Sequence, residues 1–107
     1  MHEDAGSVAY GEDISNDVST DGHSSVSLGL RQGDDLALFV GNTVSRTIST
    51  AVRVGNGVAG TYGMRVFNSM RGAWVEGEAT DADALRRGLP LQLERKGFCL
   101  IELRQET

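Results

Sequence analysis

The sequence predicts an all-β fold, a small antiparallel β-sandwich of about seven strands with one short helix near residues 80–87. Three observations predict this fold. From residue 24 onward, apolar and polar residues alternate with a period of two, which is typical of strands that bury one face. Turn residues separate these segments at intervals of about 8–12 residues. The 107 residues include 14 glycines, which favours turns and strands over long helices.

In the first half of the domain, Val26, Leu28 and Leu30 alternate with small residues and predict a strand with one buried face. Residues 36–40 are apolar at successive positions, so we expect a strand that is buried on both sides. A long β-branched segment over residues 47–54 predicts a third strand.

In the second half, Gly55-Asn56-Gly57 is a turn signal, and strands are expected over residues 61–67 and 73–79. Thr80 is the expected N-cap of the helix, and Gly88 its end. The strand over residues 89–93 contains Pro90, which favours an edge position. A last strand is expected over residues 98–104.

Residues 1–23 are predicted to form an acidic polar N-terminal arm in front of the β-sandwich domain, residues 24–107. The first 30 residues hold six acidic side chains and no Lys or Arg, and the net charge is −5. Nucleic acid and anionic membranes both require a basic surface. The charge distribution therefore argues against nucleic acid and membrane as partners, and a protein partner or a homo-oligomer is expected.

The composition also indicates in which cellular compartment the protein is found and whether it needs a cofactor. The lone Cys99 cannot form an internal disulfide, which suits a reducing compartment. The acidic N-terminus does not resemble a signal peptide, and no apolar run reaches the ~20 residues that span a membrane, so a cytoplasmic location is favoured. A catalytic zinc site needs three protein ligands and a structural one four; with only His2, His23 and Cys99 available, and Cys99 in an apolar strand, no zinc site is expected. No cofactor is expected.

A calcium loop is the one metal candidate. Asp17, Ser19 and Asp21 alternate oxygen ligands before Gly22, as such loops do. However, the twelfth position of the loop, which should hold a bidentate carboxylate, is Leu28. An ordinary Asp/Gly-rich turn explains the same residues, so no metal is predicted.

Ligand binding is expected at Trp74, Tyr62 and Glu76. A tryptophan among glutamates on a strand is either an exposed stacking platform for sugars or partner proteins, or a cap on the core. Glu76 and Glu78 share one strand face like a glycosidase pair, but they look solvent-facing and no cleft is indicated. The spacing Gly55-x-Gly57-x-x-Gly60 matches a dinucleotide motif, but strand-like sequence follows it, so we interpret it as a hairpin turn.

Three segments carry a family resemblance: LALFVGN, VRVGNGVAGTYGMRVFNS and GLPLQLERKGFCLIEL. Together, residues 36–103 resemble the accessory β-sandwich domain that follows the catalytic barrel in many glycoside hydrolases. The resemblance implies an accessory or carbohydrate-associated role. The catalytic acids of that family lie in the barrel, which this chain lacks, so no catalytic residue carries over.

The sequence therefore predicts a non-catalytic accessory or binding domain, and not an enzyme. The alternative is a structural protein, such as an oligomer-forming or capsid-decorating β protein, that uses its N-terminal arm for subunit contacts.

Overall fold

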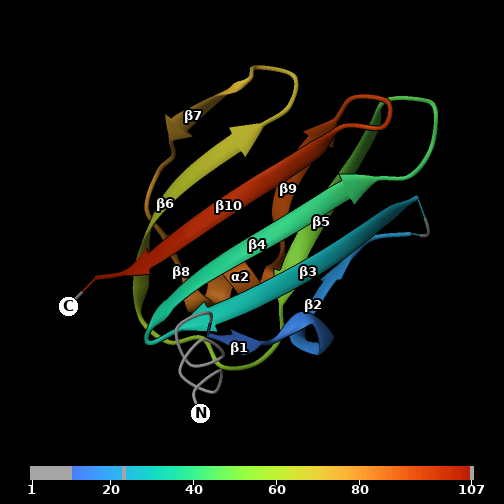
Figure 1. Cartoon of the computed structure of the whole chain (residues 1–107). Coiled ribbons are helices and arrows are strands. Elements are labelled where there is room, and N and C mark those ends of the chain that lie inside the picture. The colour runs from blue at the N-terminus through green and yellow to red at the C-terminus, as the bar shows by residue number, and fades with distance from the viewer. Residues whose placement is uncertain (1–10, 23, 107) are drawn as a thin grey trace, which may run out of the picture.

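The computed structural model describes residues 11–22 and 24–106, and within them the chain forms mainly short strands. The elements, labelled as in Figure 1, are β1 (Glu12–Asp13), the 3-10 turn η1 (Ser15–Asp17), β2 (Val18–Thr20), β3 (Ser25–Gln32), β4 (Asp35–Asn42), β5 (Ile48–Val54), β6 (Thr61–Asn68), β7 (Ala73–Glu76), β8 (Thr80–Asp81), α2 (Ala82–Arg87), β9 (Leu89–Leu93) and β10 (Phe98–Gln105).

These strands form two antiparallel sheets that face each other. The larger sheet has the order β1-β3-β4-β10-β6-β7, with β8 also paired to β6, and the smaller sheet has the order β2-β5-β9. Figure 1 shows the larger sheet in front of the smaller one, with α2 at the lower end of the molecule. The predicted all-β sandwich with one short helix is confirmed.

The core lies between the sheets and consists mainly of aliphatic side chains from alternate positions of the strands, together with Tyr62, Cys99 and Leu85 of α2. Burying such a side chain contributes about 1.5–3 kcal/mol. The inward residues that are at most 6 % exposed include Val18, Leu36, Leu38, Val40, Val52, Val54, Tyr62, Leu85, Leu93, Cys99, Ile101 and Leu103.

The start of the described chain belongs to this sandwich, which differs from the expectation of an arm over residues 1–23. Ile14 and Val18 are only 4 % and 6 % exposed, and Val18 pairs with Val54 of β5. Gly29 of β3 permits this because its missing side chain leaves space for both residues. Asp13 is exposed and precedes η1. Its pKa is lowered mainly by a hydrogen bond from the side chain of Ser15 and secondly by one from the backbone of Ser15. Residues 1–10 lie outside the described residues.

The orientation of β3 corrects one prediction. Val26, Leu28 and Leu30 were expected to face the core, but they are 51 %, 57 % and 46 % exposed. The small residues between them face inward instead, because β2 crosses close to this strand: Ser27 donates its hydroxyl to the carbonyl of Val18 at 3.3 Å. A large inward side chain would collide with β2.

The helix starts one residue later than its predicted cap. Asp81 is the N-cap, and its carboxylate accepts a hydrogen bond from the backbone N–H of Ala84 at 2.8 Å. Thr80 is buried and pairs with Tyr62 as part of β8. The strand predicted over residues 73–79 ends at Glu76. Gly88 ends the helix at φ 120°, as the sequence indicated.

The edge position predicted for Pro90 is confirmed, because β9 is the last strand of the smaller sheet. The carbonyl of Gln92, two residues along, points away from β5 and accepts a hydrogen bond from the side-chain amide of Asn68 at 3.1 Å. Alternate residues of a strand direct their backbone groups to the same side. The missing N–H of Pro90 therefore also lies on the free edge, which is poorly suited to pairing with another strand.

No helix in the described part of the chain is long and apolar enough to cross a membrane.

Candidate binding face

The outward face of the larger sheet carries an apolar row that crosses five strands. Antiparallel register places these residues side by side from β3 through β4, β10 and β6 to β7. We call this set the apolar row; its members, in order across the sheet, are Leu28, Phe39, Leu100, Phe67 and Trp74. Val26, Gly41 and Phe98 form a second, shorter row beside it.

Aromatic rings hold this face together. The rings of Phe39 and Phe67 each stack against Phe98 with centroids 5.9 Å apart, and Trp74 is tilted by 58° against Phe67 at 5.7 Å. Pairs at such distances contribute about 0.5–1.5 kcal/mol beyond the area that they bury. The rings are therefore fixed relative to one another and present a preformed surface.

Within the described chain, no strand or helix covers this face, although the Arg65 side chain lies over the Trp74 ring and the three central members of the row are partly buried. Leu28 is 57 % exposed at one end of the apolar row and Trp74 is 41 % exposed at the other. Single exposed apolar side chains are ordinary, whereas a contiguous apolar patch on a small protein marks an interaction site. A continuous row across five strands is such a patch.

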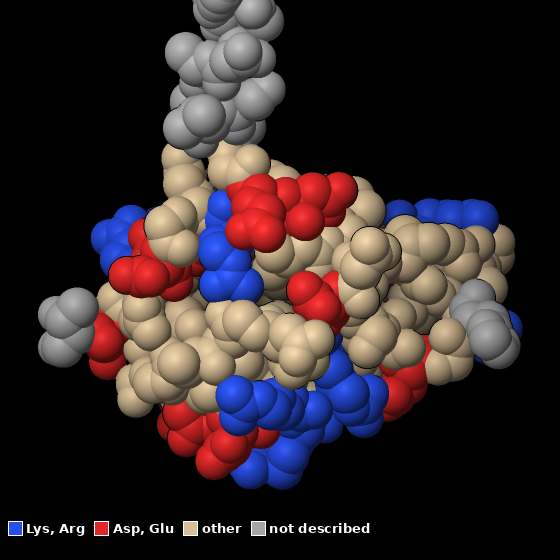
Figure 2. All heavy atoms as spheres, turned by 90° about the horizontal axis from the view of Figure 1, so that it is seen from below, with Lys and Arg blue, Asp and Glu red and all other residues tan. Residues whose placement is uncertain are grey.

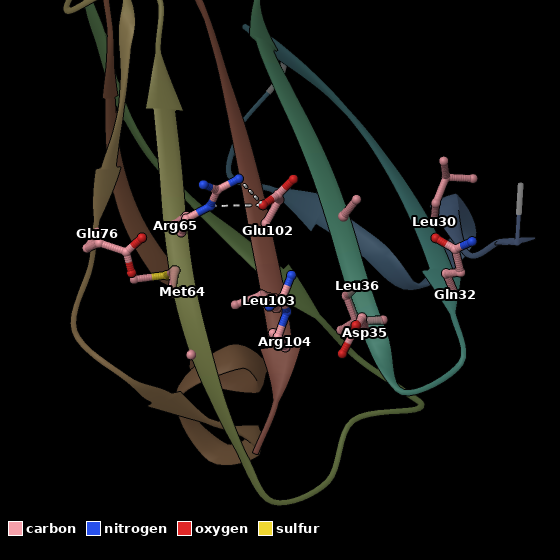
Figure 3. A pocket seen from close by; sticks show the side chains of 12 residues that line it. Leu30, Gln32, Asp35, Leu36, Met64, Arg65, Glu76, Glu102, Leu103 and Arg104 are labelled. Carbon is pink, nitrogen blue, oxygen red and sulfur yellow. Dashed lines mark hydrogen bonds and ion pairs between the residues drawn. The ribbon is translucent and has the colours of Figure 1, made fainter. Parts of the chain in front are cut away.

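In the next row toward the lower end of the sheet, β10, β6 and β7 carry charged residues, whereas β3 and β4 carry Leu30 and Ala37. Arg65 donates from Nε and Nη2 to Oε1 of Glu102 at 3.0 and 2.7 Å, and Glu76 pairs with Arg65 across the strands. Figure 3 shows Arg65 and Glu102 pointing toward each other over a hollow of about 550 Å³. On β10, β6 and β7 the face thus changes from apolar to charged along the strand direction, while on β3 and β4 it stays apolar.

Two of the carboxylates that line the hollow are engaged in hydrogen bonds. The carboxylate of Glu102 is engaged by Arg65, and the carboxylate of Asp35 accepts the backbone N–H of Gln105 at 3.1 Å. Such paired, partly exposed charges suit the rim of an interface.

The structure separates the three predicted ligand-binding residues. Trp74 and Glu76 lie on the outward face, on neighbouring rows. Tyr62 is corrected: it is only 1 % exposed, and its hydroxyl accepts the backbone N–H of Ala59 at 3.2 Å. Its ring therefore fills the core and cannot stack on a ligand. Glu78 lies in the exposed segment after β7.

The calcium candidates are not arranged around a common point. Ser19 lies within β2, and a strand extends its residues instead of curling them around an ion. The carboxylate of Asp17 accepts the side-chain amide of Asn56 at 3.1 Å, and that of Asp21 pairs with Arg53. Among the described residues, no group of three or more potential metal ligands is found.

The segment from Gly55 to Gly60 joins β5 to β6, so no helix follows it. The guanidinium of Arg31 donates to the carbonyl of Gly57 at 2.7 Å and holds this loop against β3. The hairpin turn predicted here is wrong, because β5 belongs to the smaller sheet and β6 to the larger one, so the segment crosses between the sheets. The prediction that strand-like sequence follows it is confirmed.

A second cavity of about 470 Å³ opens between β6 and β9, where the smaller sheet stops short of β7. Cys99 is one of the residues that line this cavity, and it is 1 % exposed. Burial raises the pKa of this thiol, and a hydrogen bond with Asn68 offsets part of the effect.

Cys99 should therefore react with a thiol reagent at least about 100-fold more slowly in the folded protein than in the denatured chain. The raised pKa reduces the thiolate fraction, and burial blocks access. Absorbance after addition of a chromogenic disulfide reagent measures the rate. Labelling at the denatured rate under native conditions would show that the cavity opens freely.

The charged surface does not form a field of one sign. In Figure 2, a group of basic side chains lies along the lower margin with acidic side chains beside it. The described ion pairs follow the same arrangement, for example Arg86 with Asp83 at 3.1 Å.

Four members of the apolar row did not appear among the candidates from the sequence, which named only Trp74. A signal was present: residues 36–40 are apolar at both inward and outward positions. Phe98 and Leu100 repeat this pattern in β10, the central neighbour of β4. Two adjacent strands that are apolar on both faces indicate that the outward face of the sheet is also apolar.

Comparison of the chain with models of protein families, with curated proteins and with solved structures gave no match.

Proposed function

We propose that this chain is a non-catalytic interaction domain that docks onto a protein partner through the outward face of its larger sheet. The apolar row is the observation that supports this proposal, because removing the exposed parts of its five apolar side chains from water lowers the free energy of the complex. The role is an accessory one of the kind that the resemblance to glycoside hydrolase domains implies, with docking in place of hydrolysis.

Carbohydrate binding at Trp74 is the narrower form of the accessory role, and two features favour protein docking over it. The guanidinium carbon of Arg65 lies over the Trp74 ring, 4.7 Å from its centroid, so one face of the indole is already occupied. The other side chains of the row are aliphatic or phenyl groups, which can neither donate hydrogen bonds to sugar hydroxyls nor accept them.

The outward face also suits docking better than the N-terminal segment does. The described half of that segment is already paired within its own chain, through β1 on β3 and β2 on β5. Exchanging it with a neighbouring subunit would require these pairs to break, whereas the outward face is available without rearrangement.

Leu28→Lys tests the proposal. The side chain is 57 % exposed, so we expect the free energy of unfolding to change by less than about 0.5 kcal/mol. Binding of an environment-sensitive hydrophobic dye to the dilute, folded chain should fall several-fold, because the charge interrupts the apolar row.

Met70→Lys is the matched control, since Met70 is 52 % exposed but lies in the turn after β6, beside the second cavity. It should leave dye binding unchanged. A loss of dye binding in Met70→Lys with none in Leu28→Lys would place the apolar site between the sheets and refute docking through the outward face.

A further inference from the structure

We propose that the partner is a second copy of this chain, packed face to face over the apolar row as a symmetric dimer. This inference rests on the proposed function, because it names the occupant of the same face. Three features of that face support it: its shape, its area and its distribution of charge.

The shape argument comes from sheet twist. Two sheets of similar twist pack face to face with their strands nearly aligned and about 10 Å apart. Two copies of one sheet have identical twist, so the outward faces match each other without any change in backbone. A two-fold axis in the plane of contact then brings the same apolar rows together from both sides.

The area is sufficient for a weak but specific dimer. Five strands about 4.8 Å apart and two apolar rows with their flanks give a footprint on the order of 500 Å² per copy. The pair would bury on the order of 1,000 Å² in total, which is the lower limit for specific interfaces. We therefore expect a dissociation constant in the micromolar range and not a permanent dimer.

The charges on the face do not oppose self-association, although the whole chain carries −5. The two apolar rows contain no charged residue. The charged row holds Arg65 between Glu102 and Glu76, and Arg65 is already paired with Glu102. The two carboxylates belong to the row below the apolar rows, and the guanidinium of Arg65 reaches from that row over Trp74. The charges therefore form a polar rim in place of a repulsive centre.

Trp74 provides the test, because it is the only tryptophan and it lies in the apolar row. The mass of the full-length chain by light scattering and the emission of Trp74 are followed over a dilution series. At high concentration we expect twice the 11.4 kDa monomer mass, a blue-shifted emission and reduced quenching by acrylamide. Both signals should return to monomer values at one common concentration.

Leu28→Lys, at the opposite end of the row from Trp74, should weaken this dimer at least about 10-fold, and Met70→Lys should leave it unchanged. A chain that stays monomeric at millimolar concentration overturns the second copy as partner. If Leu28→Lys still abolishes dye binding in that case, the proposal that this face docks a protein is retained, and the partner is a different protein.

A dimer that forms without any change in Trp74 emission, and that tolerates Leu28→Lys, also overturns the inference. It would assign self-association to another segment, such as residues 1–10. If Leu28→Lys also leaves dye binding unaffected, both the dimer and the proposed docking function of this face are refuted.

Discussion

Replacing Asn42 by aspartate should lower the free energy of unfolding by about 2–4 kcal/mol, although the two side chains have the same shape. Asn42 is 5 % exposed at the end of β4. Its Nδ2 donates to the carbonyls of Arg46 and Glu94 at 2.8 Å each, and its Oδ1 accepts the backbone N–H of Val44 at 3.0 Å. Aspartate cannot donate, so two part-buried carbonyls would lose their partner beside a new buried charge.

Chemical denaturation at neutral pH measures this loss, and Asn16→Asp is the control because Asn16 is exposed. The pH dependence provides a second measurement. A carboxyl group at position 42 faces carbonyl oxygens, so its pKa in the folded state should lie above its value in the unfolded chain. As the pH falls, the folded variant therefore takes up a proton before the unfolded chain does. The difference in free energy of unfolding between the variant and the unsubstituted protein should become smaller. If the variant loses no stability, or if its loss of stability does not depend on pH, then Asn42 does not connect the segments that contain Arg46 and Glu94.

The fold class was predictable from the sequence because a period of two is a local property. The inward positions of β4, β5, β6 and β10 follow directly from alternation, as Leu38, Val52 and Ile101 show. Alternation identifies two faces but does not say which of them is buried. In β3 the larger side chains, such as Leu28, face outward, because the neighbouring β2 approaches the inward positions too closely. That reversal depends on a crossing between segments, which no local pattern contains.

The candidate face was predictable only in part, for a similar reason. Phe39, Phe67 and Phe98 lie far apart in the sequence, and they meet because β10 inserts between β4 and β6 in the larger sheet. Strand order is set by long-range pairing, so the row could not be assembled from spacing alone. Trp74 was selected for its residue type, whereas Tyr62, selected on the same ground, lies in the core.

Gly29→Ala should also destabilise the protein, by about 1–3 kcal/mol, against the usual trend for glycine in a strand. Alanine normally gains about 0.4–1 kcal/mol by restricting the unfolded chain. Here a Cβ atom would lie 2.6 Å from Cγ2 of Val18 and 3.1 Å from Cγ1 of Ile14. Relief of this overlap would push β2 and η1 off the larger sheet and strain the hydrogen bond from Ile14 N–H to the Gly29 carbonyl, which is 2.9 Å long.

A double-mutant cycle with Val18→Ala separates this contact from a general intolerance of β3. Removal of the Val18 methyl groups makes space for the new Cβ, so Gly29→Ala should cost at least about 1 kcal/mol less in that background. Gly63→Ala is the matched control, because its Cβ would come closest to the flexible carboxylate of Glu106, at 3.3 Å, and we expect a change near zero. Equal costs of Gly29→Ala in both backgrounds would mean that β2 does not cross β3 at this point. The inward position of the small residues in β3, and with it the outward position of Leu28, would then lose its physical cause.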